Sequence, residues 1–242
     1  PFHKLCNQGM ITGKNEIKMS KSKGNVVSPD ALVNDYGCDS LRMYELFVGP
    51  PELDAEWDDR GIDGVNRFLK RLWNLLMDSK EADVQPTKEM IKLRHKMVYD
   101  ITNRLESFSL NTVISGFMEY NNKFIEMAKK EGGIDKETLE TIAVLLSPFA
   151  PHFAEEMWEQ LGHGETIFKA GWPSYDESAM KDDEIEVPVQ INGKTRAVIS
   201  ISADASKDEA IAAGKEAVAD KLTGTIVKEI YVPKKIINIV QK

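Results

Sequence analysis

The sequence predicts a multidomain chain in which an α-helical bundle lies between a short α/β segment and a small α+β domain. Three observations lead to this prediction. Apolar residues recur at helical spacing through about residues 61–162. Short elements separated by Gly and Pro precede them, and β-rich runs around an Asn-Gly pair follow residue 184. The length of 242 residues is enough for two or three such domains.

The composition is that of an ordinary globular protein, with 42% hydrophobic and 29% charged residues. The formal net charge of −8 argues against indiscriminate nucleic-acid binding, because such binders carry net positive charge. Charge is nevertheless segregated along the chain. Residues 1–24 hold five lysines and one acid, whereas Glu52–Asp59 holds five acids and no base. We expect this acidic run to be a solvated connection and any bound anion to lie near the basic end.

The two cysteines, Cys6 and Cys38, lie in unrelated contexts and predict neither a disulfide framework nor a metal site. They are expected to be reduced thiols in a cytoplasmic protein. No apolar run is long enough to cross a membrane, and no signal peptide is recognisable. The chain begins without Met, which suggests a piece of a longer protein.

The first sixty residues are predicted to contain only short elements. Residues 8–12 and 17–18 can pair as a small hairpin. A helix is expected to begin at Pro29, with Ser28 as its N-cap, and to stop at Gly37 in the left-handed αL conformation.

Further helices are predicted from apolar spacing, with breaks at Gly, Pro or Ser. A short helix is expected at about Ser40–Phe47, and longer ones begin near Gly61 and after Thr87. The last three are expected at 110–130, 136–146 and 151–161. The short connections from Gly61 onward predict an antiparallel bundle.

The pattern changes after a polar connector at residues 163–184. In VPVQINGKTRAVISIS, the pair Asn192-Gly193 stands between β-rich runs and predicts a type I′ hairpin, whose register is left open by irregular apolar alternation. Ser206 and Glu209 are typical of a capping box that opens a helix to about Leu222. TIVKEIYV and KIINIV predict two further strands.

Residues 17–25, IKMSKSKGN, are called the lysine loop here. In a compact loop Lys18, Lys21 and Lys23 can converge on one point, and several ammonium groups around one site suit a polyphosphate. Gly24 permits a tight turn. A solvated loop or a localisation signal is the alternative for an arbitrary stretch of this composition.

The order of the letters distinguishes these alternatives. Lys18-Met19-Ser20-Lys21-Ser22 resembles the KMSKS signature of class I aminoacyl-tRNA synthetases at all five positions. The resemblance implies that Lys18 and Lys21 are catalytic during amino-acid activation, with Lys21 the strongest candidate. It also implies that ATP or pyrophosphate is bound by the whole stretch of Lys18, Met19, Ser20, Lys21, Ser22 and Lys23. Lysines that reach the departing pyrophosphate mainly in the transition state lower the barrier directly.

Three other stretches resemble the leucyl members of that family, of the bacterial type: NQGM at residues 7–10, GIDGVNRFLKRLWNL from Gly61, and VPVQINGKTR from Val187. SPFAPHFAEEMWEQLG is also typical of the isoleucyl, valyl and methionyl enzymes. The resemblance covers essentially the whole chain.

The resemblance implies a function for each part of the chain. Residues 1–60 would be the KMSKS-loop remnant at the end of an α/β Rossmann catalytic domain, and 61–162 an anticodon-binding-type bundle. After the connector at 163–184, residues 185–242 would form a small α+β domain that contacts tRNA.

The resemblance also implies part of a ligase that joins leucine to tRNA(Leu), using ATP with Mg²⁺ and releasing AMP and pyrophosphate. The family's HIGH motif has no counterpart in the sequence. These 242 residues are therefore expected to be inactive alone. No metal site within the chain, no membrane and no obligate protein partner are expected.

Basic residues of the last domain are weaker candidates for contacts to nucleic acid: Lys194, Arg196, Lys234 and Lys235. His152 is expected to be structural, because no carboxylate or nucleophile lies near it in the sequence. Trp73 and Trp158 fall on apolar helix faces, which favours the core over stacking on RNA bases.

Two alternative functions stay open. The chain could act purely as an RNA-binding or assembly module, or it could belong to a valyl, isoleucyl or methionyl relative. The VPVQINGKTR stretch argues against the second alternative.

Overall fold

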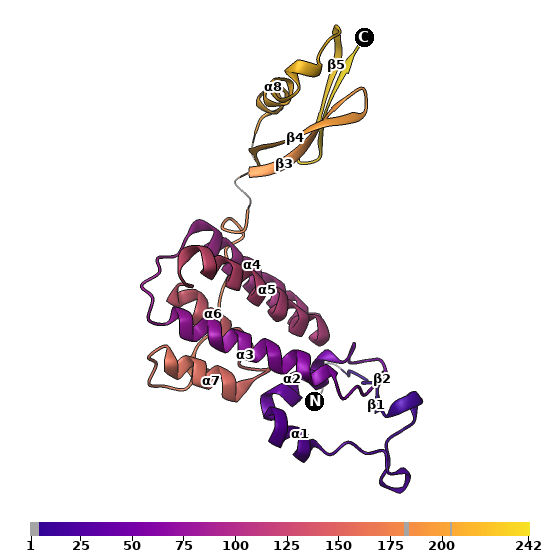
Figure 1. Cartoon of the computed structure of the whole chain (residues 1–242), viewed down its shortest axis with the longest axis vertical. Helices are drawn as coiled ribbons and strands as arrows, with labels where there is room; N and C mark the ends of the chain where they lie inside the picture. The colour runs from indigo at the N-terminus through magenta and orange to yellow at the C-terminus, as the bar shows by residue number, and fades with distance from the viewer. Residues whose placement is uncertain (1–4, 182–183, 204) are drawn as a thin grey trace. The chain divides into compact units, whose positions relative to one another are not determined.

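The computed structural model describes residues 5–181, 184–203 and 205–242, so Lys4 of the basic end and Asp182–Asp183 of the acidic connector lie outside the described residues. The chain divides into two compact units, one ending at Met180 and one beginning at Lys181. Each unit has its own hydrophobic core. Figure 1 labels the elements of both.

The first unit begins with short elements. Strand β1 (Ile11–Thr12) pairs in parallel with β2 (Ala55–Glu56), and helices α1 (Pro29–Tyr36) and α2 (Cys38–Phe47) lie between them in the chain. Gly37 separates the two helices with φ 84° and ψ 156°. The predicted stop at this glycine is correct in position, but its ψ is not that of the αL conformation, because the chain turns directly into α2.

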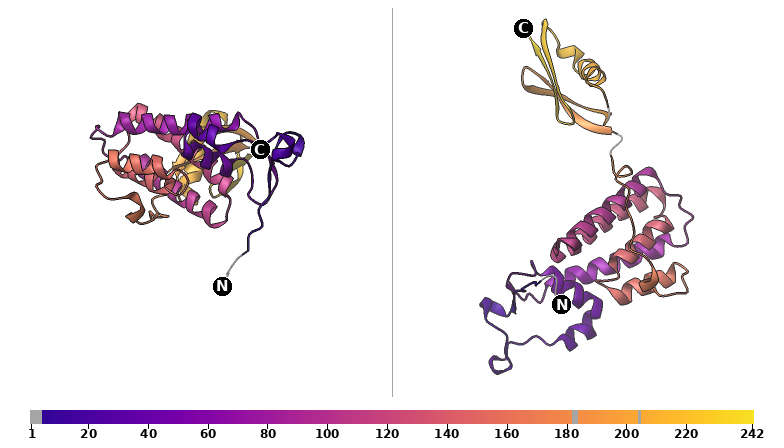
Figure 2. Two further views of the ribbon diagram at one scale, coloured as in Figure 1. Left: turned by 90° about the horizontal axis from the view of Figure 1, so that it is seen from below. Right: turned by 180° about the vertical axis from the view of Figure 1, so that it is seen from behind.

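Five further helices form the bundle of the first unit. They are α3 (Gly61–Ser79), α4 (Lys88–Glu106), α5 (Leu110–Glu131), α6 (Lys136–Leu146) and α7 (Pro151–Gln160). Figures 1 and 2 show α3, α4 and α5 side by side, with α6 and α7 packed against them. One continuous core runs from α2 to α7, so α2 packs as part of the bundle.

Side chains that accept backbone hydrogen bonds explain where two of these helices begin. Thr87 accepts a hydrogen bond from the N–H of Met90, and Asp135 accepts one from the N–H of Thr138. Gly132 ends α5 in the αL conformation. These residues can be recognised in the sequence, so the predicted helix bounds agree with the observed bounds within a residue or two.

Residues 163–180 lie on the bundle. Thr166 donates its hydroxyl to Glu155 of α7, and the indole N–H of Trp172 donates to Thr102 of α4 at 2.9 Å. The N–H of Asp176 donates to His95 at 3.1 Å. Most of the stretch predicted as a polar connector is therefore attached to the first unit.

The second unit is a four-stranded sheet with the strand order β4-β3-β6-β5 and one helix. Its elements are β3 (Glu184–Ile191), β4 (Lys194–Ser202), α8 (Lys207–Ala217), β5 (Ile226–Val232) and β6 (Ile236–Gln241). Strands β3 and β6 are parallel, and the other two pairs are antiparallel. Helix α8 packs Ala210 against the apolar residues of the sheet.

The two sequence signals in this unit are confirmed. Asn192 and Gly193 both have positive φ, 50° and 79°, as a type I′ turn requires. Ser206 and Glu209 form a reciprocal capping box. Helix α8 ends at Ala217, before the predicted Leu222, and a 3-10 turn follows it. A register shift at Val189/Gln190 accounts for the irregular alternation.

One prediction for the first sixty residues is wrong, and another is correct only in part. Residues 8–12 and 17–18 do not form a hairpin, because Ile11 pairs with Ala55 from 44 residues further along. The five acids of the acidic run are exposed, as expected, but the run is more than a connection, because it contains β2 and buries Trp57. The carboxylate of Asp54 also accepts the N–H of Met10 at 2.7 Å.

Among the residues that the structure describes, no helix is both long and apolar enough to cross a membrane.

Candidate functional site

The lysine loop contains a single 3-10 turn at Lys21–Lys23. Ser20 enters the turn in extended conformation, and Gly24 leaves it with φ 64° and ψ 17°. The N–H of Lys23 donates to the carbonyl of Ser20 at 3.1 Å. Gly24 is therefore needed for its left-handed backbone, as the sequence predicted.

Asn25 closes the loop across its base. Its side-chain oxygen accepts the N–H of Ser20 at 2.9 Å, and its side-chain N–H donates to the carbonyl of Lys18 at 3.3 Å. These two bonds hold the ends of the turn together while leaving its outer side open. A short polar side chain is thus used to order a loop that has few apolar contacts.

The three lysines of the loop are exposed. Within residues 5–181, none of Lys18, Lys21 and Lys23 has an ion-pair or hydrogen-bond partner for its ammonium group. A 3-10 turn rotates about 120° per residue, so Lys21 and Lys23 leave the turn in different directions. In this conformation the loop does not gather its lysines at one point.

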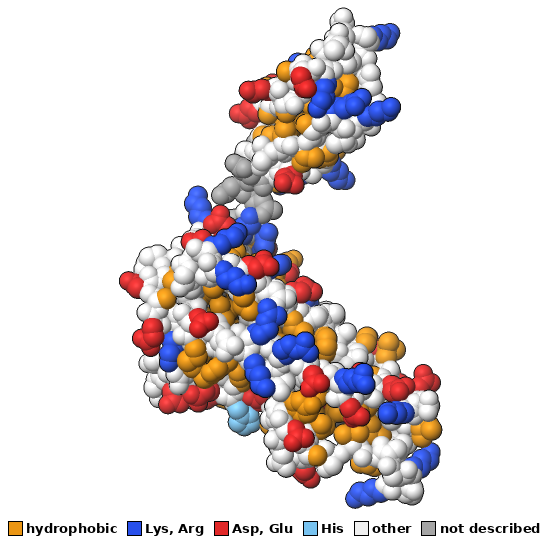
Figure 3. Space-filling view, in the orientation of Figure 1, with side chains coloured by type: hydrophobic (Ala, Val, Ile, Leu, Met, Phe, Trp, Pro, Cys, Tyr) orange, Lys and Arg blue, Asp and Glu red, His pale blue; other side chains and the backbone are white. Residues whose placement is uncertain are grey.

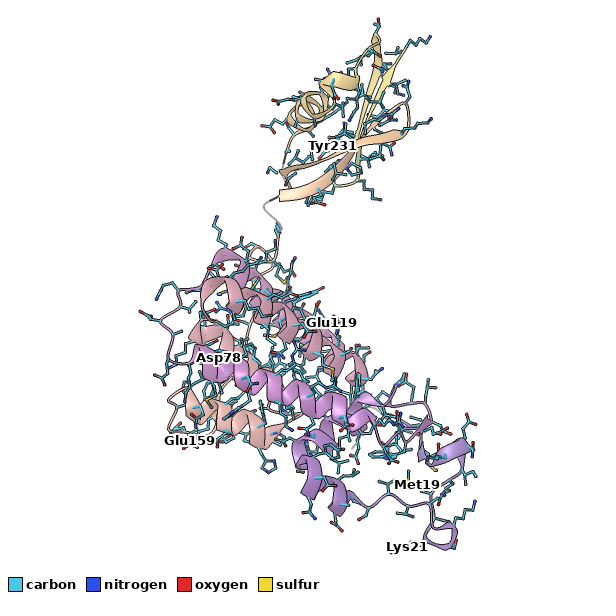
Figure 4. All side chains as sticks on the ribbon, in the orientation of Figure 1. Met19, Lys21, Asp78, Glu119, Glu159 and Tyr231 are labelled. Carbon is cyan, nitrogen blue, oxygen red and sulfur yellow. The ribbon has the colours of Figure 1, made fainter. Side chains whose placement is uncertain are left out.

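The loop is attached to the core on one side only. Met19 is half-buried and packs against the core of the first unit. Figure 4 shows Lys21 at the tip of the loop, beyond Met19. The hydroxyls of Ser20 and Ser22 lie 3.1 Å apart and bond to each other. The loop is thus an open basic turn on a single apolar anchor.

A basic face on α3 was not singled out from the sequence. Arg67, Lys70 and Arg71 are exposed, and their spacing of three and four residues places them on one side of the helix. Figure 3 shows Lys and Arg side chains spread among acidic ones on the viewed face of the first unit. The helical spacing of the three bases was the signal that could have identified this face.

The four basic candidates of the second unit, Lys194, Arg196, Lys234 and Lys235, are all exposed. Lys194 follows the β3–β4 turn, whereas Lys234 and Lys235 lie in the turn before β6. Because β3 and β6 are parallel, these two turns lie toward opposite ends of the sheet. The fold does not bring the four residues together.

The side chains of Asn192 and Asn238 hold the β3–β4 turn. The Asn192 side chain donates to the backbone carbonyl of Gln241 at 3.0 Å and accepts the Gln241 N–H at 2.9 Å, and the N–H of Gly193 donates to the side-chain oxygen of Asn238 at 3.2 Å. The turn before Lys194 is therefore fixed to the last strand.

Two of the four tryptophans, Trp73 and Trp158, lie where the sequence suggested. Trp57 is buried, whereas Trp73 and Trp158 are half-buried beside the core. Trp158 stacks on His163 with centroids 3.6 Å apart. Trp172 is 40% exposed, and its indole N–H is already bonded to the bundle.

His152 lies at the start of α7, as predicted, but it has a carboxylate partner. Its Nδ1 is 3.0 Å from Oδ1 of Asp39 on α2, 113 residues away in the chain. Sequence proximity could not reveal this pair.

Residues 87–211, more than half of the chain, match the family of the anticodon-binding domain of tRNA ligases. The chain belongs to this family. Residues 1–58 match the class I tRNA synthetases for isoleucine, leucine, methionine and valine. The lysine loop lies within the second match and α4 to α7 lie within the first.

The chain is 47% identical over 259 aligned residues to a leucine–tRNA ligase of Fervidobacterium nodosum, and the alignment covers all of the chain. It is also similar to the crystal structure of the ternary complex of Agrobacterium radiobacter K84 agnB2 LeuRS with tRNA and LeuAMS. That match has a TM-score of 0.80, 28% identity and full coverage of the chain. The predicted resemblance to leucyl-tRNA synthetases is confirmed.

The chain spans 32% of the length of the Fervidobacterium relative and 34% of the Agrobacterium chain. In the part of the chain that the structure describes, no three His, Cys, Asp or Glu side chains are grouped so that they could hold a metal ion.

Proposed function

We propose that this chain serves a leucine–tRNA ligase, with the lysine loop binding the phosphates of ATP and the remaining elements binding tRNA(Leu). One observation carries the proposal: three exposed lysines, unpartnered within residues 5–181, stand on a turn that is closed at its base by Asn25. The similarity of the entire chain to a leucine–tRNA ligase supports leucine as the amino acid.

The lysines have a defined role in this reaction. The leucine carboxylate attacks the α-phosphorus of ATP, the bond from that phosphorus to the pyrophosphate oxygen breaks, and negative charge develops on pyrophosphate. Lys18 and Lys21 would stabilise that charge as catalytic residues, and Lys23 would add to the same field. A tRNA hydroxyl then attacks the leucyl carbonyl, and AMP leaves.

The remaining loop residues are proposed as nucleotide contacts. Ser20 and Ser22 can turn their hydroxyls from each other to phosphate oxygens, and Met19 would hold the loop at a fixed depth. Because the lysines diverge in the open turn, the loop must close to bring them to one polyphosphate. Mg²⁺ would arrive with ATP, neutralising its phosphates as part of the substrate.

The parts of the chain have distinct proposed roles. Residues 1–60 end the catalytic domain, 61–162 form the tRNA-docking bundle, 163–184 connect, and 185–242 contact tRNA. The two-stranded parallel pair β1–β2 supports the first assignment, since parallel strands are normally found inside larger sheets. The basic face of α3 supports the second, and Lys194, Arg196, Lys234 and Lys235 are the proposed contacts of the last domain.

The nucleotide role is tested in a hybrid enzyme, in which this chain replaces the matching portion of the Fervidobacterium nodosum leucine–tRNA ligase. Lys21→Ala should lower leucine-dependent ATP–pyrophosphate exchange about 100-fold, since it removes one transition-state contact. Its affinity for tRNA(Leu) should change by less than about twofold, because one phosphate contact at most is lost. Lys14→Ala, an exposed lysine in the same basic segment, is the matched control. Equal losses in both variants would refute the assignment.

The tRNA role is tested with the 242 residues alone. They should bind tRNA(Leu) more tightly than an unrelated tRNA, with an affinity that falls as salt is raised. They should support no leucine-dependent exchange, because the HIGH motif is absent from the sequence. Salt-independent binding would contradict phosphate-driven docking. Specific binding by the chain together with an inactive hybrid enzyme would favour the RNA-binding or assembly module.

A further inference from the structure

The carboxylate of Asp39, at the start of α2, also binds the start of α7. The N–H of Phe153 donates to Oδ2 of Asp39 at 2.6 Å, and Nδ1 of His152 donates to Oδ1 at 3.0 Å. The Asp39 side chain is only 10% exposed, whereas that of His152 is 77% exposed. A nearly buried carboxylate thus joins two helices that are more than a hundred residues apart in the chain.

Helix α7 depends on this carboxylate because its own sequence cannot cap it. Ala150 occupies the N-cap position and has no side-chain acceptor, and Pro151 follows at the first helical position. In α4 and α6 the acceptor comes from the local residues Thr87 and Asp135. In α7 the acceptor comes from α2, so the cap is also a tertiary contact.

A second bond joins the same two regions one turn further along α2. Nη2 of Arg42 donates to the carbonyl of Pro148, just before α7, at 3.2 Å. A cavity of about 660 Å³ lies beside Asp39, lined by Tyr36, Trp73 and Phe153 among others. Side-chain packing therefore does not fill this junction, and the directional bonds to Asp39 and Pro148 fix how α2 meets α7.

The junction lies between the lysine loop and the bundle in the chain. Helix α2 is part of the bundle core through buried residues such as Met43. Helix α1 has no buried residue, but its half-buried Leu32 and Tyr36 pack against the core, and Gly37 connects it to α2. The lysine loop precedes α1, so its position relative to the bundle depends on where α2 begins, as well as on the packing of Met19 and on the β1–β2 pair.

We propose that Asp39 is a positioning residue, which holds the lysine loop at a fixed place relative to the tRNA-docking bundle. The inference rests on the proposed function. Adenylate formation uses the loop without tRNA, and tRNA binding uses the bundle without the loop. Transfer of leucine requires both sites in register, and a misplacement of about 1 Å can cost about 100-fold in rate. Loss of the Asp39 contacts should therefore affect transfer most.

The experiment compares Asp39→Asn with Asp135→Asn in the hybrid enzyme. Both aspartates are buried and accept a backbone N–H at a helix start, but Asp135 is the N-cap of α6, whereas Asp39 lies in α2. Asp39→Asn should lower the single-turnover rate of leucine transfer at least about tenfold. ATP–pyrophosphate exchange and the Kd for tRNA(Leu) should stay within about twofold. Asp135→Asn should change all three quantities by less than about twofold at a temperature where both variants are folded.

The outcomes separate the inference from the function on which it rests. Unchanged transfer in Asp39→Asn overturns the inference, and so does a parallel loss of all three quantities in both variants, which marks a structural role. If Asp39→Asn does not fold, His152→Ala replaces it, because that side chain is exposed, and transfer should then fall about threefold with exchange unchanged. An unaltered hybrid enzyme without exchange refutes the proposed function itself, and the inference with it.

Discussion

Replacement of Gly61 by Ala is expected to destabilise the bundle through Tyr44. A Cβ at position 61 would lie 2.3 Å from Cε2 and 2.4 Å from the hydroxyl oxygen of Tyr44. Tyr44 is buried, its hydroxyl donates to the carbonyl of Asp58 at 2.6 Å, and its ring meets Trp57 edge-on at 4.9 Å. Burial raises the pKa of Tyr44, so the hydroxyl stays protonated as a donor. The ring has to move, and both contacts are disturbed.

The magnitude follows from the separate contributions. Overpacking costs about 1–3 kcal/mol, the lost hydrogen bond about 1 kcal/mol, and the ring contact about 0.5–1.5 kcal/mol. Helix propensity returns at most about 1 kcal/mol for Gly61→Ala. The net loss is about 3 kcal/mol in the free energy of unfolding. For a unit of this size that corresponds to a Tm lower by roughly 6–12 °C.

Thermal unfolding followed by circular dichroism at the helical band measures this loss. Gly64→Ala is the matched control, since it lies on the same helix and its Cβ would meet no atom within 4 Å. It should raise stability by about 0.5–1 kcal/mol. A Gly61→Ala protein that melts at or above the unaltered temperature would refute the steric reasoning.

Three further predictions concern other parts of the chain. Gly193→Ala should destabilise the second unit by about 1–2 kcal/mol, because φ is positive at this position. The loss should be measured as faster amide exchange in β3 and β4. Val198→Thr, at an exposed position of β4, is the control and should leave exchange unchanged. The pKa of Glu209 is lowered by hydrogen bonds from Ser206, so this cap stabilises α8 above the unfolded-state pKa and is lost as pH falls through the folded-state value. Amide protection of α8 should therefore decline in acid below about pH 4.5, and Glu209→Gln should abolish this pH dependence. Asp54→Ala removes the acceptor for Met10 and should speed proteolysis of residues 5–27 several-fold, without changing the melting of the bundle.

Local signals made much of the fold predictable. Thr87 and Asp135 mark helix starts, and Asn192-Gly193 fixes a turn, because each acts on backbone groups within a few residues. Contacts between distant segments were not predictable in this way. Ile11 finds its strand partner 44 residues later, and each strand of that pair is too short to show a period.

In the candidate site, too, local features were predictable from the sequence and contacts between distant segments were not. The order of the residues in the lysine loop predicted a phosphate-binding role, and Gly24 predicted the turn that the structure shows. The directions of Lys21 and Lys23 depend on the 3-10 geometry, which composition does not reveal. The partner of His152 was missed because Asp39 is brought to it by the packing of α2 on the bundle, and no local pattern encodes that distance.

The pairing of β1 with β2 has a consequence for the order of folding. It joins residues 44 apart and rests on a few backbone bonds, including those from Ala55 to Met10 and from Trp57 to Thr12. Closing so long a loop has an entropic cost that only later contacts offset, so the helices should form first. The same pairing should be the first to open in the native state. The lysine loop therefore belongs to a late-folding, early-opening unit, and hydrogen exchange should detect its release while the bundle stays folded.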